Sequence, residues 1–245
     1  MRNILTIFRR EVAAYFNSPI AYIFIILFVF ILGAFFFVLQ GFFQQENPDL
    51  RSFFALFPWF LSIFIPAVTM RLWSEESRSG TIELLLTWPV QVWEVVVGKY
   101  LASLFVIAVG LTLTLVVPLS LAGSITSIEW GVIFTSYLGA LLISSVYTAL
   151  GAWTSTLSSN QIVSLLIAIA FSLVLVAIGS PPVVKFLNEI VDDLGKNIGW
   201  FGTDHHFREF SKGLVNPVGL IYGLSVTVFF LVLNNLAIEG RKYKG

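Results

Sequence analysis

Long apolar runs recur along this chain, and short polar segments separate them. A helix that crosses the hydrocarbon layer of a membrane needs about 20 mostly apolar residues. None of these runs contains an Asp, Glu, Lys, Arg or His side chain. The pattern predicts an all-α, polytopic membrane protein with a single domain over residues 1–245. Six transmembrane helices are expected, at residues 20–43, 53–70, 100–122, 131–153, 162–179 and 218–238.

The second run contains two prolines, Pro58 and Pro66. A proline inside a helix leaves the carbonyl four residues earlier without its usual donor. A membrane helix tolerates this only where a neighbouring helix or a water supplies the missing hydrogen bond. The sequence therefore also leaves open a count of five spans, with the second run lying half in the membrane interface.

The segment before the first run predicts an amphipathic helix over residues 3–17 that lies along the membrane surface. Arg2, Arg9 and Arg10 lie away from its apolar face, and Ser18-Pro19 marks the turn into the membrane. The apolar face consists of Ile4, Leu5, Phe8, Val12, Tyr15 and Phe16.

Basic residues set the orientation, because cytoplasmic loops of membrane proteins carry an excess of Lys and Arg. With six spans and a cytoplasmic N-terminus, nine of the 14 basic residues lie in the cytoplasm and five lie outside. The loop over residues 71–99 is then cytoplasmic, and the segment 180–217 is extracytoplasmic. We expect a multi-pass protein of the cell membrane, in bacteria the inner membrane, with both termini cytoplasmic.

The amino-acid composition supports a membrane protein and excludes several other classes of protein. Hydrophobic residues make up 57% of the chain and charged residues 11%, whereas soluble domains contain about 25% charged residues. So few charges exclude disordered, coiled-coil and nucleic-acid-binding proteins. The chain has no cysteine, which excludes disulfides and Cys-based metal sites.

The sequence lacks the groups that would let the chain power transport by itself. Gly98-Lys99 has neither the upstream glycine nor the following hydroxyl residue of a P-loop. Ion-coupled transporters use protonatable side chains at membrane depth, and the predicted spans contain none. We therefore expect no enzymatic activity and no cofactor of its own, with energy supplied by a partner.

Two other functions are compatible with the sequence. His205, His206 and Glu209 lie close together, and the i, i+4 spacing of His205 and Glu209 can hold zinc. A membrane-embedded metal-dependent hydrolase is therefore one alternative, although a solvated helix on the outer surface explains the same residues. A membrane scaffold or channel that works without ATP is the other alternative.

Small residues recur at every fourth position of the fourth span. Such a stripe lets another helix approach closely, and packing within the bundle explains it better than a contact with another subunit. The stripe consists of Ala140, Ser144, Thr148, Ala152 and Thr156.

The cytoplasmic loop carries the most informative pattern, over residues 66–90. Gly80 can end one helix and Thr81 can cap the next, with Glu83 near its positive end, before Pro89 stops it. An exposed apolar surface on this short helix suits docking onto a cytosolic partner, although a helix lying on the bilayer would show the same surface. Its apolar residues are Ile82, Leu84, Leu85 and Leu86.

This loop resembles the permease subunits of type-2 ABC exporters, the ABC-2 superfamily. It is closest to the gliding-motility-type and nitrous-oxide-reductase-maturation-type permeases. The opening of the chain also matches that family, in Arg9-Arg10-Glu11 and in Tyr15-Phe16-x-Ser18-Pro19. The loop motifs are P-x-x-T-M-R over 66–71, Glu75-Glu76, G-T-x-E-L-L-L-T-x-P over 80–89, and Gly98-Lys99 before the third span.

The resemblance implies a permease subunit that pairs with a second permease, either another copy or a homologue, within the membrane lipid. Separate ABC ATPase subunits would bind ATP and Mg²⁺ and dock on the cytoplasmic side. An exporter is implied, but its cargo stays open because family members move different cargo. The implied coupling helix would contact the ATPase through Gly80, Thr81, Ile82, Glu83, Leu84, Leu85, Leu86 and Pro89.

The resemblance also places Glu75 and Glu76 against the gating region. Glu11 lies near the apolar edge of the N-terminal helix, so its carboxylate should find a partner at the interface. The loop offers Arg71 and Arg78. We expect a pair between Glu11 and one of these arginines to tie the N-terminal helix to the coupling segment.

Overall fold

The structure, a computed structural model, describes residues 2–39, 50–82, 90–121 and 129–242. These ranges are predominantly helical and contain no strand. Five stretches are long and apolar enough to cross a membrane, and the chain is therefore an all-helical, multi-pass membrane protein. The five are Ala21–Val38, Val92–Ser120, Trp130–Thr154, Gln161–Gly179 and Pro217–Arg241.

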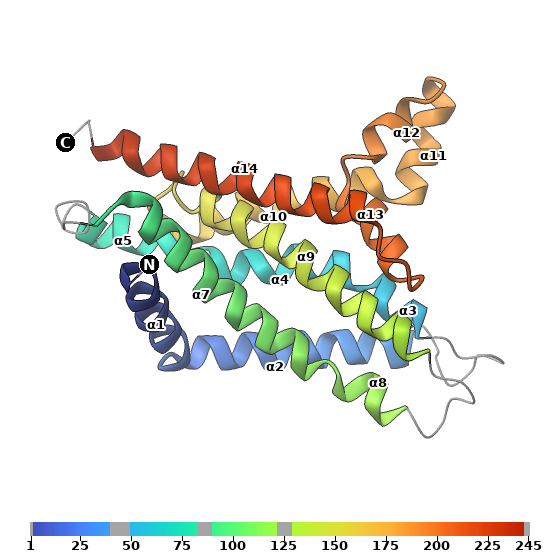
Figure 1. The fold of residues 1–245 in the computed structure, drawn as a ribbon, viewed down its shortest axis with the longest axis horizontal. Helices are drawn as coiled ribbons and strands as arrows, with labels where there is room; N and C mark the ends of the chain where they lie inside the picture. Colours follow the sequence, from blue (N-terminus) through green and yellow to red (C-terminus); the bar gives the residue numbers. More distant parts are fainter. Residues whose placement is uncertain (1, 40–49, 83–89, 122–128, 243–245) are drawn as a thin grey trace.

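The longer helices lie side by side in a bundle, and shorter helices lie at its two ends (Figure 1). The bundle consists of α2 (Pro19–Ala34) with the π-helical η1 (Phe35–Leu39), α4 (Phe57–Thr69), α7 (Val92–Leu113), α9 (Trp130–Thr154), α10 (Gln161–Gly179) and α14 (Pro217–Lys242).

One end of the bundle, which we call the α1 end, carries two shorter helices and the C-terminal end of α14 (Figure 1). These two helices are α1 (Arg2–Phe16) and α5 (Arg71–Ser79). The opposite end, which we call the α11 end, carries α3 (Arg51–Ala55), α8 (Val116–Ser120), α11 (Pro181–Ile190), α12 (Leu194–Gly199) and α13 (Thr203–Phe210).

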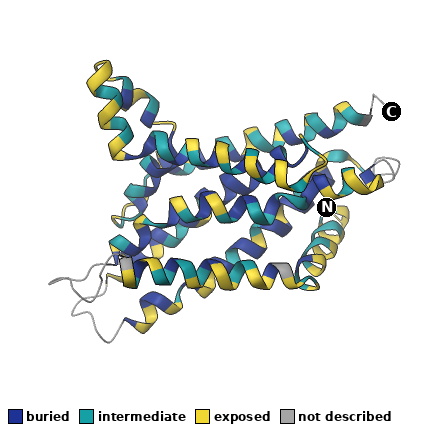
Figure 2. Cartoon of the chain, turned by 180° about the vertical axis from the view of Figure 1, so that it is seen from behind, coloured by how far each residue is buried: buried dark blue, intermediate teal, exposed yellow. Residues whose placement is uncertain are grey.

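Helix α9 forms the centre of the bundle. Within its candidate span 72% of the residues are buried, against 22% for α2 and 33% for α14, and it packs against α4, α7, α10, α13 and α14. Figure 2 shows buried residues through the middle of the bundle and exposed residues on its outer faces and on α11. The stripe of small residues expected on this helix is at most 3% exposed at every position, so it packs within the chain as predicted.

The second predicted run, 53–70, is divided between α3 and α4. Pro66 lies inside α4, where it cannot donate to the carbonyl of Ser62. The hydroxyl of Ser172 in α10 lies 2.7 Å from that carbonyl and 2.7 Å from the carbonyl of Ala168 in its own helix, so a neighbouring helix places a donor beside the freed carbonyl. Although α4 has only 13 residues, it runs from α3 at the α11 end to α5 at the α1 end (Figure 1).

The helix that contains the third predicted run, 100–122, begins before that run. Helix α7 starts at Val92, where Gln91 and Glu94 form a capping box that satisfies free amide groups of the first turn. Glu94 and Lys99 therefore lie inside a helix that is long and apolar enough to cross a membrane. Both residues precede the predicted span, and residues 100–122 themselves carry no charge.

Helices α4 and α9 approach each other most tightly at Gly151. A Cβ at this position would lie 2.1 Å from Oγ1 and 3.0 Å from Cβ of Thr69. We therefore predict that Gly151→Ala destabilises the bundle by about 1–3 kcal/mol through overpacking, seen as a lower melting temperature in detergent. Gly131→Ala in the same helix is the control, because nothing lies within 4 Å of its added Cβ. An unchanged melting temperature for Gly151→Ala would contradict this packing.

Candidate functional site

The segment that begins at Gly80 is anchored in the α1 end. Gly80 ends α5 in the left-handed conformation, with φ 71°, which glycine adopts without strain. Residues 81 and 82 are helical again, and Oγ1 of Thr81 lies 2.8 Å from Oγ of Ser79. Ile82 is 7% exposed and packs with buried residues of α1, α5 and α7. Its side chain therefore does not belong to the exposed apolar surface that the sequence predicts.

The rest of the expected coupling helix lies outside the described residues. This part comprises Glu83, Leu84, Leu85, Leu86 and Pro89. The structure thus describes the beginning of the expected coupling helix, at residues 80–82.

Lys99 is the centre of a buried charge cluster where α1, α5 and α7 meet. Its side chain is 3% exposed, and Nζ lies 2.8 Å from Oε1 of Glu76 in α5 and 3.3 Å from Oε1 of Glu11 in α1. Nζ also donates to the carbonyl of Leu72 at 3.0 Å and lies 5.2 Å from the centre of the Trp73 ring. A buried charge is stable when it is paired and hydrogen-bonded, so one ammonium group holds three helices together.

Arg10 completes the charge balance. Its Nη2 lies 2.7 Å from Oε1 of Glu11 and 3.9 Å from Oε1 of Glu76, so two cations face two carboxylates. We call Arg10, Glu11, Glu76 and Lys99 the Lys99 cluster. Burial by itself raises the pKa of Glu11, but Lys99 and Arg10 outweigh this effect and hold that pKa below its ordinary value of 4.5. Glu11 is therefore a carboxylate at neutral pH.

Tyr15 provides a second link between α1 and the bundle. Its hydroxyl donates to the carbonyl of Val68 in α4 at 2.9 Å and lies 3.1 Å from Oγ of Ser103 in α7. The guanidinium of Arg71 lies over the Tyr15 ring, 4.3 Å from its centre, at the distance of a cation–π contact. Tyr15 and the Lys99 cluster together connect α1 with α4, α5 and α7.

The expectation that Glu11 pairs with Arg71 or Arg78 is wrong. Glu11 pairs with Lys99 and Arg10, whereas Arg71 contacts the Tyr15 ring. Arg78 is exposed in the last turn of α5. The reason is that α1 packs along α7, which brings Glu11 next to Lys99. Of the expected acidic pair, Glu76 joins the cluster and Glu75 is exposed.

Sequence reasoning missed Lys99 and Arg10 as members of the site. Lys99 stands between two apolar stretches of α7, over residues 95–97 and 100–102, and this isolation is the signal that could have identified a buried cation in need of partners. The sequence predicts that Arg10 lies away from the apolar face of the N-terminal helix. Its long side chain nevertheless reaches back to the Glu11 carboxylate, which lies on the next residue.

Arg241 ties the last helix to the same end of the bundle. Its Nη1 donates to Oγ of Ser77 in α5 at 2.9 Å, and its Nη2 donates to the carbonyl of Thr156, which follows α9. The C-terminal end of α14 is thus bound to α5, the helix that precedes the expected coupling helix.

The histidine motif lies at the α11 end, in α13. Nε2 of His206 lies 2.8 Å from the carbonyl of Trp200, and its ring stacks on Tyr222 with centroids 4.1 Å apart. Glu209 accepts a hydrogen bond from Nδ2 of Asn216 at 2.5 Å. Within the described ranges, no three His, Cys, Asp or Glu side chains come together as a metal site. These contacts explain His206 and Glu209 as packing residues, and they give the hydrolase alternative no support.

Burial and neighbouring side chains set the charge states of Asp204, His205 and His206 in α13. Asp204 pairs with Arg208 at 3.4 Å. Burial raises the pKa of Asp204 to about 6, and the charge of Arg208 offsets this only in part. Burial likewise lowers the pKa of His205 and of His206, so both rings are neutral at pH 7.

Comparison with known proteins identifies one family. The family model described as "ABC-2 family transporter protein" matches residues 5–198. This match includes most of α1, all of α5 and α7, and the whole Lys99 cluster. No curated protein matches the chain.

The substitution Lys99→Met tests the Lys99 cluster directly. The variant removes the buried ammonium and leaves two carboxylates facing Arg10 alone, and removing one partner of a buried ion pair costs about 3–5 kcal/mol. We expect a large fall in the melting temperature of the purified chain in detergent. Lys185→Met, at an exposed lysine of α11, should melt like the wild type. A Lys99→Met variant as stable as the Lys185→Met control would contradict the cluster.

Proposed function

Because the chain belongs to the ABC-2 transporter family, we propose that it forms the membrane half of an ATP-driven exporter. Members of this family are non-catalytic membrane permeases of ABC transporters, and they work with ABC ATPase subunits. In this proposal the ATPases bind ATP and Mg²⁺, and the chain carries the translocation path. The family match and the apolar helices support the permease role.

The topology that we propose has six crossings, with α4 as the shortened second one. The N-terminal helix α1 and the C-terminal end of α14 lie at the same end of the bundle (Figure 1), which agrees with an even number of crossings. The α1 end would face the cytoplasm of the cell membrane, because nine of the 14 basic residues then lie on that side.

The Lys99 cluster would carry the nucleotide signal from the ATPase to the membrane helices. The coupling segment follows α5 directly, and α5 contributes Glu76 to the cluster. The single observation that carries this proposal is the buried Nζ of Lys99, which binds carboxylates of α1 and α5 from its place in α7. A displacement of residues 80–89 would therefore move α5, α1 and the start of α7 together.

An unpaired oxygen of Glu76 favours a second arrangement of the Lys99 cluster. Oε2 of Glu76 is buried and has no hydrogen-bond partner among the described residues. Leaving a buried acceptor unpaired costs about 1–3 kcal/mol, and more when it is charged. Coupling energies between sites are commonly ~1–3 kcal/mol. A second arrangement, in which α1 and α5 shift together against the bundle and Oε2 gains a partner, would therefore differ in free energy by an amount similar to a coupling energy.

A second permease completes the transporter in this proposal, either as another copy or as a homologue. The central motif over residues 66–99 also supports a placement near the gliding-motility-type and nitrous-oxide-reductase-maturation-type permeases. Cargo differs among such permeases.

Leu85→Asp tests the proposed coupling helix. If residues 80–89 seat on an ATPase through an apolar surface, a carboxylate at position 85 should release the ATPase, because a buried charge without a partner is costly. We expect the ATPase to be lost from affinity-purified permease, while the permease still inserts into the membrane and melts at the wild-type temperature.

The matched control is Leu214→Asp, which places the same charge on a residue that is 61% exposed and precedes α14 at the α11 end. This variant should retain the ATPase. Normal co-purification of the ATPase with Leu85→Asp would count against the proposed coupling helix.

A further inference from the structure

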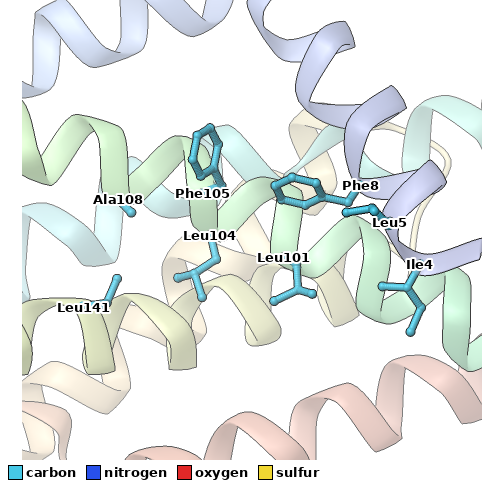
Figure 3. A pocket seen from close by; sticks show the side chains of 8 residues that line it. All are labelled: Ile4, Leu5, Phe8, Leu101, Leu104, Phe105, Ala108 and Leu141. Carbon is cyan, nitrogen blue, oxygen red and sulfur yellow. The ribbon is translucent and has the colours of Figure 1, made fainter. Parts of the chain in front are cut away.

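An apolar groove of about 500 Å³ opens on the surface of the bundle between α1, α7 and α9 (Figure 3). Every side chain that lines it is apolar. Leu5 of α1, Leu101 and Phe105 of α7, and Leu141 of α9 are each 39–51% exposed. The groove therefore leaves a continuous apolar surface from the N-terminal helix to the central helix of the bundle.

The groove is built by the way in which α1 crosses α7. At Gly98 the two helices touch, since Cγ2 of Ile7 lies 2.8 Å from the place where a Cβ of residue 98 would stand. Asn3 also donates to Oε2 of Glu94 at 2.9 Å, which fixes the start of α1 on the start of α7. Helix α1 packs along the first part of α7, with Tyr15 beside Ser103 and Phe8 beside Phe105, and α7 then continues along the bundle (Figure 1).

The groove runs along a helix that crosses the membrane. The α7 residues that line it extend from Leu101 to Ala108, and seven helical steps of 1.5 Å give a length of about 10 Å. One leaflet of the hydrocarbon layer is about 15 Å thick, half of the ~30 Å of the whole core. The groove thus has the direction of a lipid acyl chain and covers about two thirds of a leaflet.

Two arginines of α1 lie one helical turn before and after Leu5, a residue that lines the groove. Arg2, Leu5 and Arg9 follow one another on one exposed side of α1, at helical spacings of three and four residues. Neither arginine side chain forms an ion pair or hydrogen bond within the part of the chain that the structure describes, whereas the neighbouring Arg10 is held by the Lys99 cluster. Two exposed cations of α1 are therefore each one helical turn from the groove lining at Leu5.

We propose that this groove binds one acyl chain of an anionic phospholipid, whose phosphate contacts Arg9 and Arg2. The apolar lining favours a hydrocarbon chain, its direction matches that of lipid chains, and the unpaired arginines select a negative headgroup. Such a lipid would hold Leu5 and Phe8, which lie on the same helix as Glu11, and would thereby stabilise the position of α1. The proposal requires that the chain spans a membrane, but it does not depend on docking of an ATPase.

The test uses the purified full-length chain, with phosphatidylglycerol and phosphatidylcholine of identical acyl chains added in equal amounts. Native mass spectrometry then measures how much of each lipid stays bound. One basic residue near a lipid surface favours an anionic headgroup about fivefold, so we expect at least a fivefold preference for phosphatidylglycerol. Arg9→Gln should reduce this preference about fivefold, and Lys185→Gln, at an exposed lysine of the opposite end, should leave it unchanged.

A second pair of variants tests the groove itself. Ala108→Trp and Leu141→Trp each fill it from a different helix, and either one, if it melts like the wild type, should abolish the preferential retention of phosphatidylglycerol. Equal retention of the two lipids by the wild type would overturn the proposal. A preference that survives in the filled variants would overturn it as well. A loss of dimer mass in those variants would show instead that a second copy of the chain occupies the groove.

Discussion

A buried positive charge at Lys99 constrains how the α1 end of this protein is arranged. An ammonium group inside a helical bundle costs several kcal/mol unless carboxylates and carbonyls surround it, whereas an exposed ion pair contributes only about 0–1 kcal/mol. With its side chain 3% exposed, Lys99 belongs to the first case. Its carboxylate partners come from α1 and α5, so neither helix can leave α7 without exposing or stranding a charge.

The other contacts at the α1 end also join its helices to one another and to the bundle. Tyr15 ties α1 to α4 and α7, Arg241 ties α14 to α5, and Gly98 lets α1 lie directly on α7. Ile82, at the beginning of the coupling segment, packs into the same core. The helices that would receive a push from an ATPase are therefore joined by polar contacts to the helices that cross the membrane. This arrangement is what a permease requires, because motion at the docking surface must reach the translocation path.

The sequence predicts the apolar helices well where charges are absent. The runs at 131–153 and 162–179 correspond within a residue to α9 and α10. It does not show that the helix of the third run begins at Val92, because Glu94 and Lys99 lower the local hydropathy, although partners from α1 and α5 bind them in the fold. The partner of Glu11 was unpredictable for a related reason: Lys99 is 88 positions away, and only the packing of α1 on α7 brings the two together. The helix end at Gly80 could be predicted from local chemistry, because a helix end with positive φ favours glycine.

The central claim is that α1 and α5 move as one body around Lys99 when an ATPase binds nucleotide. The chain has no native cysteine, so spin labels at introduced cysteines report only the chosen positions. Ala14 of α1 and Ser79 of α5 are exposed, and Val174 of α10 is an exposed reference outside the cluster. Double electron–electron resonance on the permease–ATPase complex should show the same distance between positions 14 and 79 with and without bound ATP, while the distance between positions 79 and 174 changes. A distance between positions 14 and 79 that shifts on ATP binding would contradict the account.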